Sequence, residues 1–237
     1  MINSQTLLAL IPARGGSKRL PRKNILSFLG QPLISWTIQA GLESKFVDRL
    51  VVSTEDVEIS EVSKKWGADV PFLRRGELAT DSAETFDVIL DVLTKLNALG
   101  ERFDYLLLLQ PTSPLRTAHH IDESIKLLLE KNADSVISVT EIDHPIEWTS
   151  TLPIDLSMDE FFSSPLVTTR SQNYPTRYRL NGAIYLLRIS CMLSNSSLFL
   201  KNGAYAYKME RQHSIDIDTV EDFIFAETIA KNRELPS

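Results

Sequence analysis

The chain has few of the residues that build disulfides, thiolate metal sites or membrane spans. Cys191 is the only cysteine in 237 residues, which excludes an internal disulfide and fits a reducing compartment. The longest apolar run, near Tyr105 to Leu109, is far shorter than the roughly 20 residues of a transmembrane helix. The start of the chain also lacks the features of a secretory signal peptide. We therefore expect a cytoplasmic protein that does not bind membranes.

Several catalytic motifs are missing as well. His119 and His120 are adjacent, and His144 and His213 are isolated, so no pair has the spacing of zinc ligands. The chain contains no G-x-S-x-G elbow, and its cysteine has no nearby partner, so covalent catalysis has no support. Neither the G-x-x-x-x-G-K-[ST] nor the G-x-G-x-x-G phosphate motif is present.

The charge is unevenly distributed. A net charge of −6 argues against a general nucleic-acid-binding protein. Residues 1–42 nevertheless contain five basic and no acidic residues, and residues 161–209 contain six basic and no acidic residues. All 31 acidic residues therefore lie in the rest of the chain. Two acid-free segments in an acidic protein suggest two anionic ligands or two parts of one site; chance, combined with a basic interface, is the alternative.

The first acid-free segment contains a phosphate-binding candidate. Leu7 to Ile11 is an apolar run that predicts a buried first strand, and the loop that follows holds Gly15, Gly16 and Ser17. Glycines let the backbone approach an anion, and Arg and Lys bind phosphate oxygens. We predict a nucleoside triphosphate here, since ligands of open α/β sheets collect at the carboxyl ends of strands, although a solvated surface turn would have the same composition. The loop's five cations are Arg14, Lys18, Arg19, Arg22 and Lys23.

A pair of aspartates near the end of the chain predicts a metal site. In the sequence Ile215-Asp216-Ile217-Asp218, an extended backbone places both carboxylates on one face, about 6.5 Å apart, and both isoleucines on the other. Such hard oxygen ligands suit Mg²⁺, which one or two carboxylates hold together with phosphates and water. Alternatively, Asp218 only caps the last helix.

The order of apolar patterns predicts an α/β fold with a mostly parallel, doubly wound sheet. Strands and helices alternate as far as residue 139, then a Pro-, Ser- and Thr-rich excursion covers 140–180, and regular structure returns afterwards. We therefore divide the chain into a core of residues 1–139 and 181–237 and an excursion that finds its partner surface elsewhere, such as on a second subunit. The expected strands are 7–11, 49–54, 105–110, 135–139, 182–187 and 204–208, and the expected helices cover 33–42, about 59–66, 83–100, 121–129 and 220–231.

Five stretches follow one another along nearly the whole chain. They are Ile11-Pro12-Ala13-Arg14 to Lys23-Asn24, Leu78-Ala79-Thr80-Asp81-Ser82-Ala83, Gln110 to Arg116, Arg179-Leu180-Asn181-Gly182-Ala183-Ile184-Tyr185 and Asp216-Ile217-Asp218-Thr219. Together they resemble the motifs of the acylneuraminate (CMP-sialic acid) cytidylyltransferases. Any one of them is a weak signal, but the ordered set is specific.

The resemblance implies a Rossmann-like nucleotidyltransferase, a homodimer formed through the excursion, CTP as the donor and Mg²⁺ as the cofactor. It implies catalytic roles for Arg14, Lys23, Asp216 and Asp218, with the two aspartates as the metal ligands. Contacts to the nucleotide are implied for Ala13, Arg14, Gly15, Ser17 and Lys23, with Asn24 near the ribose and Arg74, Ala83 and Thr85 around the cytosine. Contacts to the sugar acid are implied for Gln110, Arg170, Tyr185 and Phe199, Arg170 being suited to its carboxylate.

The implied reaction transfers CMP from CTP to the anomeric hydroxyl of a nine-carbon 2-keto sugar acid and releases pyrophosphate. Two departures from the sialic-acid pattern, Glu147 after His144-Pro145-Ile146 and Leu198-Phe199 in place of an aromatic pair, concern the acceptor. We therefore hypothesise an acceptor related to sialic acid, such as legionaminic or pseudaminic acid. The alternatives are an eight-carbon Kdo-specific relative and a non-catalytic nucleotide-binding subunit.

Overall fold

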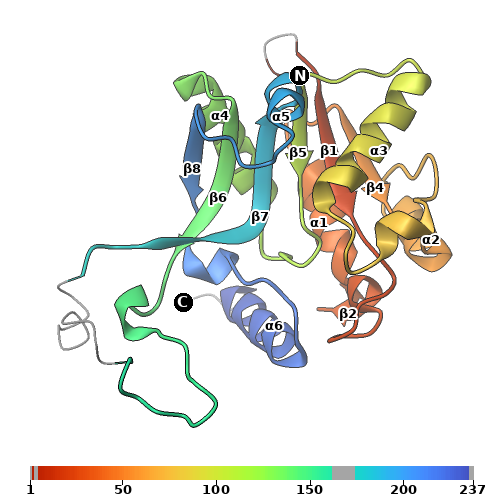
Figure 1. Cartoon of the computed structure of the whole chain (residues 1–237). Coiled ribbons are helices and arrows are strands. Elements are labelled where there is room, and N and C mark those ends of the chain that lie inside the picture. Colours follow the sequence, from red (N-terminus) through yellow and green to blue (C-terminus); the bar gives the residue numbers. More distant parts are fainter. Residues whose placement is uncertain (1, 3–4, 162–173, 235–237) are drawn as a thin grey trace.

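The computed structural model describes residue 2, residues 5–161 and residues 174–234, which form one six-stranded sheet with helices on both faces (Figure 1). The strand order is β4-β1-β5-β7-β6-β8, and all the strands except β7 point the same way. The mostly parallel α/β sheet predicted from the sequence is therefore confirmed. The strands are β1 (Leu7–Pro12), β4 (Arg49–Ser53), β5 (Tyr105–Leu108), β6 (Ser135–Glu141), β7 (Tyr178–Arg188) and β8 (Ala204–Lys208).

Strand β1 shows why helices cover both faces of the sheet. All of its residues from Leu7 to Ile11 are fully buried; Leu7, Ala9 and Ile11 belong to one hydrophobic cluster and Leu8 and Leu10 to another. The first cluster includes side chains of α1 (Leu33–Leu42), α2 (Val57–Lys65) and α4 (Ala118–Lys131), and the second includes side chains of α3 (Thr85–Ala98) and α5 (Ile189–Asn195). A strand buried on both faces needs a continuous apolar run.

The remaining helix, α6 (Val220–Glu234), covers a small hairpin formed by β2 (Ser27–Phe28) and β3 (Gln31–Pro32). Phe28 and Phe223 meet edge to face, with ring centroids 5.4 Å apart, inside a third apolar cluster that also holds Ile215 and Ile217. This packing fixes the segment before α6 beside the loop that follows β1. The hairpin and α5 were not predicted, because each is too short to show a period in the sequence.

The excursion begins and ends inside the sheet. Strands β6 and β7 continue their antiparallel pairing as far as Glu141 and Tyr178, past a register shift between Ile137 and Val139, and Figure 1 shows this ribbon leading away from the body of the domain. The strands are thus longer than predicted, whereas the division into a core and a 140–180 excursion stays a prediction. The described part of the excursion exposes the apolar side chains of Ile146, Leu152, Ile154 and Leu156.

None of the helices in the described part of the chain combines the length and the apolar character needed to cross a bilayer.

Candidate active site

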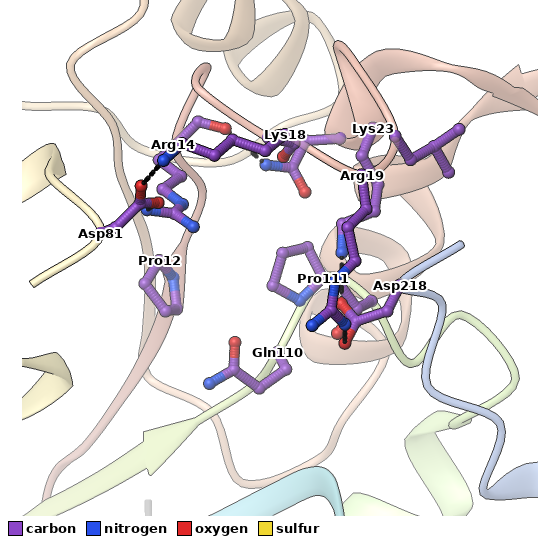
Figure 2. Close-up of a pocket in the computed structure, with 13 residues that line it drawn as sticks. Pro12, Arg14, Lys18, Arg19, Lys23, Asp81, Gln110, Pro111 and Asp218 are labelled. Carbon is purple, nitrogen blue, oxygen red and sulfur yellow. Dashed lines mark hydrogen bonds and ion pairs between the residues drawn. The ribbon is translucent and has the colours of Figure 1, made fainter. Parts of the chain in front are cut away.

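A cavity of about 470 Å³ opens at the carboxyl ends of β1 and β5 (Figure 2). Four chain segments that are distant in sequence form its walls: the cationic loop after β1, the segment that carries Asp81, the turn after β5 and the segment before α6. The lining residues are Pro12, Arg14, Ser17, Lys18, Arg19, Leu20, Lys23, Asn24, Asp81, Gln110, Pro111, Thr112 and Asp218. The predicted phosphate loop and one predicted metal ligand therefore face the same space.

The cationic loop is anchored to the strand beside it. The N–H of Ala13 donates to the Ser53 carbonyl oxygen at 2.9 Å, and the N–H of Gly15 donates to Glu55 Oε1 at 2.7 Å. A Cβ on Gly15 would lie only 2.4 Å from Asp56 Oδ2. Close approach to the start of α2 is thus the reason for glycine at this position. Ala13 and Gly15 do not line the cavity, and the Gly15 N–H is already used by Glu55.

Lys23 joins the loop to the aspartate segment. Its side chain is nearly buried, and its Nζ donates to the Ile217 carbonyl oxygen at 2.7 Å and to Asp218 Oδ1 at 2.9 Å. Arg19 lies 3.5 Å from the other oxygen of Asp218. Asn24 is also buried, and its Nδ2 donates to the Arg14 carbonyl oxygen at 2.9 Å, which holds the loop closed.

The aspartate pair adopts the predicted alternation. Ile215 and Ile217 are buried, whereas Asp216 and Asp218 are exposed. Only Asp218 lines the 470 Å³ cavity; Asp216 lines an adjacent cavity of about 500 Å³ together with Arg179. Although Asp216 keeps exposed surface, partial burial raises the pKa of its carboxyl, and the nearby Asp218 charge raises it further, while a hydrogen bond with Thr112 acts in the opposite direction.

The described residues contain no group of three His, Cys, Asp or Glu side chains that could hold a metal by itself. The two aspartates would therefore need oxygen ligands from a substrate to complete a Mg²⁺ site, which is the way Mg²⁺ is commonly held.

A third cavity, of about 450 Å³, adjoins the first and shares Gln110 with it. It is lined by Ala83 and Thr85, predicted near cytosine, and by Tyr185 and Phe199, predicted near the sugar acid. The rings of Tyr185 and Phe199 meet edge to face with centroids 6.2 Å apart. Burial, and to a smaller extent the Asp216 charge, raise the pKa of the Tyr185 hydroxyl.

Arg74, predicted near the cytosine, does not reach these cavities. Arg74 is buried; its Nη2 donates to Glu55 Oε2 at 2.8 Å, and it lines neither the 470 Å³ nor the 450 Å³ cavity. Arg170 lies outside the described residues. Glu147, which the sequence suggested as an acceptor contact, forms an ion pair with Arg177 within the excursion.

Asp81 was not predicted as a site residue. Its carboxylate lies in the 470 Å³ cavity, 2.7 Å from Arg14 Nη1 and 2.5 Å from Lys18 Nζ. Lys18 and Arg19 were recognised as cations of the loop but were given no role. Asp81 lies in the motif from Leu78 to Ala83, so a sequence motif did point to this position as a functional one. No sequence pattern pointed to Glu55, which holds both the loop and Arg74, because a single acid after a strand is common.

The chain was compared with known protein families, and the family described as Cytidylyltransferase matches residues 8–235. The chain belongs to the cytidylyltransferase family. The resemblance predicted from the five motifs is therefore confirmed, and this cytidylyltransferase is an enzyme rather than a non-catalytic nucleotide-binding subunit.

Three curated relatives show where this cytidylyltransferase lies within its family. It is 36% identical to the CMP-N,N'-diacetyllegionaminic acid synthase of Legionella pneumophila, covering 94% of this chain and 95% of the relative. It is 33% identical to the pseudaminic acid cytidylyltransferase of Campylobacter jejuni, covering 94% and 96%. It is 37% identical to the N-acylneuraminate cytidylyltransferase of Escherichia coli over 96% of this chain but 53% of that relative. The cytidylyltransferase thus spans about half the length of the third protein and nearly all of the first two.

Solved structures agree on the fold. The structure of CMP:2-keto-3-deoxy-manno-octonic acid synthetase complexed with CTP superposes with a TM-score of 0.71 at 16% identity, over 97% of this chain and 100% of the other. A 4-diphosphocytidyl-2C-methyl-D-erythritol synthase from Anaerococcus prevotii superposes with a TM-score of 0.65, also at 16% identity, over 97% of this chain and 98% of the other. At this identity the likeness concerns the nucleotidyltransferase fold alone.

Proposed function

We propose that this enzyme transfers CMP from CTP to the anomeric hydroxyl of a nine-carbon 2-keto sugar acid and releases pyrophosphate. The observation that carries the proposal is the meeting of the cationic loop with Asp218 in one cavity, directly beside a second cavity that contains aromatic side chains. The names of the three curated relatives, all of which handle acids of this class, support it. The likeness to the eight-carbon enzyme is one of fold alone, so it does not favour that alternative.

The triphosphate of CTP would lie in the 470 Å³ cavity. Arg14, Lys18, Arg19 and Lys23 all line it, and Ser17 adds a hydroxyl donor. Cations arranged around a triphosphate before the reaction stabilise the charge that builds up on the leaving pyrophosphate. Asn24 is buried and fixed to the Arg14 backbone, so we assign it to the ribose side of the nucleotide, as the family resemblance implies.

The sugar acid would lie in the 450 Å³ cavity, against Gln110, Tyr185 and Phe199. Because Gln110 lines both cavities, an acid bound there would hold its anomeric hydroxyl close to the α-phosphorus. Ala83 and Thr85 lie in the same cavity, so the cytosine and the acceptor would share it. Arg74 would act by holding Glu55 in place rather than by touching the base.

We also propose that Mg²⁺ is the cofactor. The donor set fits this metal, since Asp216 and Asp218 offer carboxylate oxygens on the same side of an extended segment next to the phosphate cavity. One oxygen of Asp218 lies 3.5 Å from Arg19, so that carboxylate is not saturated by close donors. When bound, the ion would neutralise phosphate charge as a Lewis acid.

The homodimer remains part of the proposal. The excursion exposes several large apolar side chains in the single chain, among them Ile154 and Leu156, which is costly unless another surface covers them. We place the enzyme in the cytoplasm because its lone cysteine fits a reducing compartment.

The proposal is tested by incubating the purified enzyme with CTP, Mg²⁺ and one acid at a time. The acids are N-acetylneuraminic, N,N'-diacetyllegionaminic, pseudaminic and 2-keto-3-deoxy-manno-octonic acid. We expect pyrophosphate release and a CMP-sugar of the corresponding mass with a nine-carbon acid, and the highest kcat/KM with legionaminic or pseudaminic acid. Turnover of the eight-carbon acid alone would contradict the acceptor class, and absence of turnover with every acid would contradict the reaction.

A further inference from the structure

Asp81 occupies the position in the cavity that the proposed function assigns to phosphate. Its two carboxylate oxygens are divided between two cations of the loop, with Oδ1 at 2.7 Å from Arg14 Nη1 and Oδ2 at 2.5 Å from Lys18 Nζ. Figure 2 shows this carboxylate facing Arg14 and Lys18 at the rim of the cavity, across from Asp218. An anion supplied by the protein itself thus engages two of the cations that would hold the triphosphate.

The segment that carries Asp81 is attached only lightly to the rest of the protein. It follows a short 3-10 helix, η2 (Gly76–Ala79), and makes a turn in which the Ala83 N–H donates to the Thr80 carbonyl oxygen at 3.3 Å. No hydrophobic side chain of residues 76–83 belongs to the buried core, and Asp81 is 47% exposed. Ion pairs at such exposed positions are weak, so a stronger anion can displace this carboxylate.

A triphosphate is that stronger anion, because it offers several charged oxygens to the same two side chains. The Asp81 carboxylate occupies Arg14 Nη1 and one side of the Lys18 ammonium, and its negative charge would repel a phosphate group bound to the same two cations. We infer that Asp81 takes the place of phosphate on Arg14 and Lys18 in the empty loop and that the triphosphate displaces it. This inference rests on the proposed function, since it takes the 470 Å³ cavity as the triphosphate site.

Displacement of Asp81 affects the neighbouring 450 Å³ cavity, because residues that follow Asp81 in the chain line that cavity. Ala83 and Thr85, which follow Asp81 closely, line the 450 Å³ cavity assigned to the acceptor. When Asp81 leaves the loop, the turn from Thr80 to Ala83 loses its contact with the cationic loop and is free to rearrange. Binding of the nucleotide is therefore expected to alter the lining of the acceptor cavity at these residues.

The test compares Asp81→Asn with the wild-type enzyme in binding inorganic tripolyphosphate, measured by calorimetry without Mg²⁺. Removing the competing carboxylate is expected to tighten binding about three- to tenfold, the combined value of two exposed ion pairs. Glu130→Gln makes the same charge change at the last turn of α4, which lies at the opposite end of the sheet, and is expected to leave the affinity unchanged. Weaker binding by Asp81→Asn, or an affinity equal to that of the wild type, would overturn the inference.

A second measurement follows the segment directly by amide hydrogen exchange. In the wild-type enzyme, tripolyphosphate is expected to speed exchange in peptides that cover residues 76–84, and Asp81→Asn is expected to show the faster exchange without any anion. Slower exchange on binding would mean that the segment closes over the ligand, and it would overturn the inference. If tripolyphosphate binds to neither protein, the phosphate site of the proposed function is wrong as well, whereas equal binding by both removes only the role of Asp81.

Discussion

Lys23 Nζ lies 2.9 Å from Asp218 Oδ1, although the two residues are 195 positions apart in the chain. The contact closes one side of the 470 Å³ cavity, because the same nitrogen also holds the Ile217 carbonyl oxygen at 2.7 Å. One lysine therefore fixes the aspartate segment to the loop, while the packing of Ile217 under α6 fixes it to the core. The first prediction tests the aspartate half of this contact.

Asp218→Asn is expected to lower kcat about a hundredfold or more, because the amide neither balances the Lys23 charge nor offers a carboxylate to a cation beside the triphosphate. The Asp218 side chain is half-exposed, so the free energy of unfolding should change by at most about 1 kcal/mol. Steady-state pyrophosphate release and urea denaturation measure the two effects. Glu221→Gln, an exposed carboxylate three residues further along, is the matched control and should keep both values. Near-normal turnover by Asp218→Asn would remove Asp218 from the catalytic machinery.

Gly15 and Gly16 form a second matched pair. Alanine at residue 15 would place a methyl group 2.4 Å from Asp56 Oδ2, whereas nothing lies within 4 Å of a Cβ at residue 16. The Asp56 carboxylate cannot move aside freely, since it accepts from the Ile59 N–H at 3.0 Å and pairs with Arg22. Gly15→Ala is therefore expected to cost about 1–3 kcal/mol of unfolding free energy and to raise the KM for CTP, as overpacking does.

The comparison variant, Gly16→Ala, should be neutral in both measurements. Thermal or urea unfolding and nucleotide saturation curves provide the two readings. If both alanine variants behave alike, then the contact between the loop and the start of α2 does not determine the shape of the loop.

Much of this arrangement could be predicted from the sequence, because local patterns determined it. The apolar run from Leu7 to Ile11 predicted a buried first strand, and the alternation of Ile215 to Asp218 predicted which side chains face the core; both are confirmed. The direction of a strand within the sheet could not be predicted in this way. The strand from Gly182 to Leu187 is apolar whichever way it runs, so nothing in its composition shows that β7 lies antiparallel between β5 and β6.

Long-range polar contacts were the least predictable part. The resemblance placed Arg74 around the cytosine, yet Arg74 is buried against Glu55, and that pairing depends on how the segment after α2 returns to β4. Asp81 likewise reaches Arg14 only because α3 starts close to the end of β1. Such contacts depend on the tertiary arrangement, which no window of sequence contains.

The pairing of Arg74 with Glu55 leads to a third prediction. Arg74 is nearly fully buried, and Glu55 also accepts the Gly15 N–H at 2.7 Å. Glu55→Gln leaves one of these two donors facing an amide nitrogen. It also leaves the buried Arg74 guanidinium without a countercharge. We expect a loss of about 3 kcal/mol in unfolding free energy, the lower end of the range for breaking a buried ion pair.

Glu58→Gln is the control for this prediction, since Glu58 pairs with Arg22 at the surface of the same segment. An exposed pair of this kind is expected to contribute at most about 1 kcal/mol. Urea denaturation of the two variants separates the cases. Equal, small losses would show that Arg74 finds another partner or water when Glu55 is neutral.

Phe199 provides a test of the assignment of the two cavities. Its ring is 55% exposed and packs edge to face on Tyr185, so alanine should leave the fold intact. Phe199→Ala is expected to raise the KM for the sugar acid about tenfold, which corresponds to the loss of one aromatic contact, while the KM for CTP changes little. Steady-state kinetics with each substrate varied in turn checks this. An equal rise in both constants would mean that Phe199 contacts the nucleotide as well as the acid.

Asp216 should be unfavourable to stability while it serves catalysis. Partial burial, and then the Asp218 charge, raise the pKa of its carboxyl in the folded protein above the unfolded value. A raised carboxyl pKa stabilises the fold most below the unfolded pKa, near about 3.9, and this stability is lost as the pH rises through the folded pKa. At neutral pH the ionised Asp216 therefore weakens the fold, and Asp216→Asn is expected to have a higher free energy of unfolding than the wild type.

The gain in unfolding free energy of Asp216→Asn over the wild type should shrink as the pH falls toward 4, because the protonated wild-type carboxyl then resembles the amide. The same substitution, which should stabilise the fold, is expected to abolish turnover. Asp216→Asn should be inactive at every pH, because the amide offers no carboxylate to a cation beside the triphosphate. Urea denaturation at several pH values, together with a kcat profile, measures both. A variant less stable than the wild type at neutral pH would mean that the negative charge of Asp216 is favourable in the fold, through its bond with Thr112 or the Lys23 charge. Turnover by Asp216→Asn close to that of the wild type would instead remove the case for a metal ligand at this position.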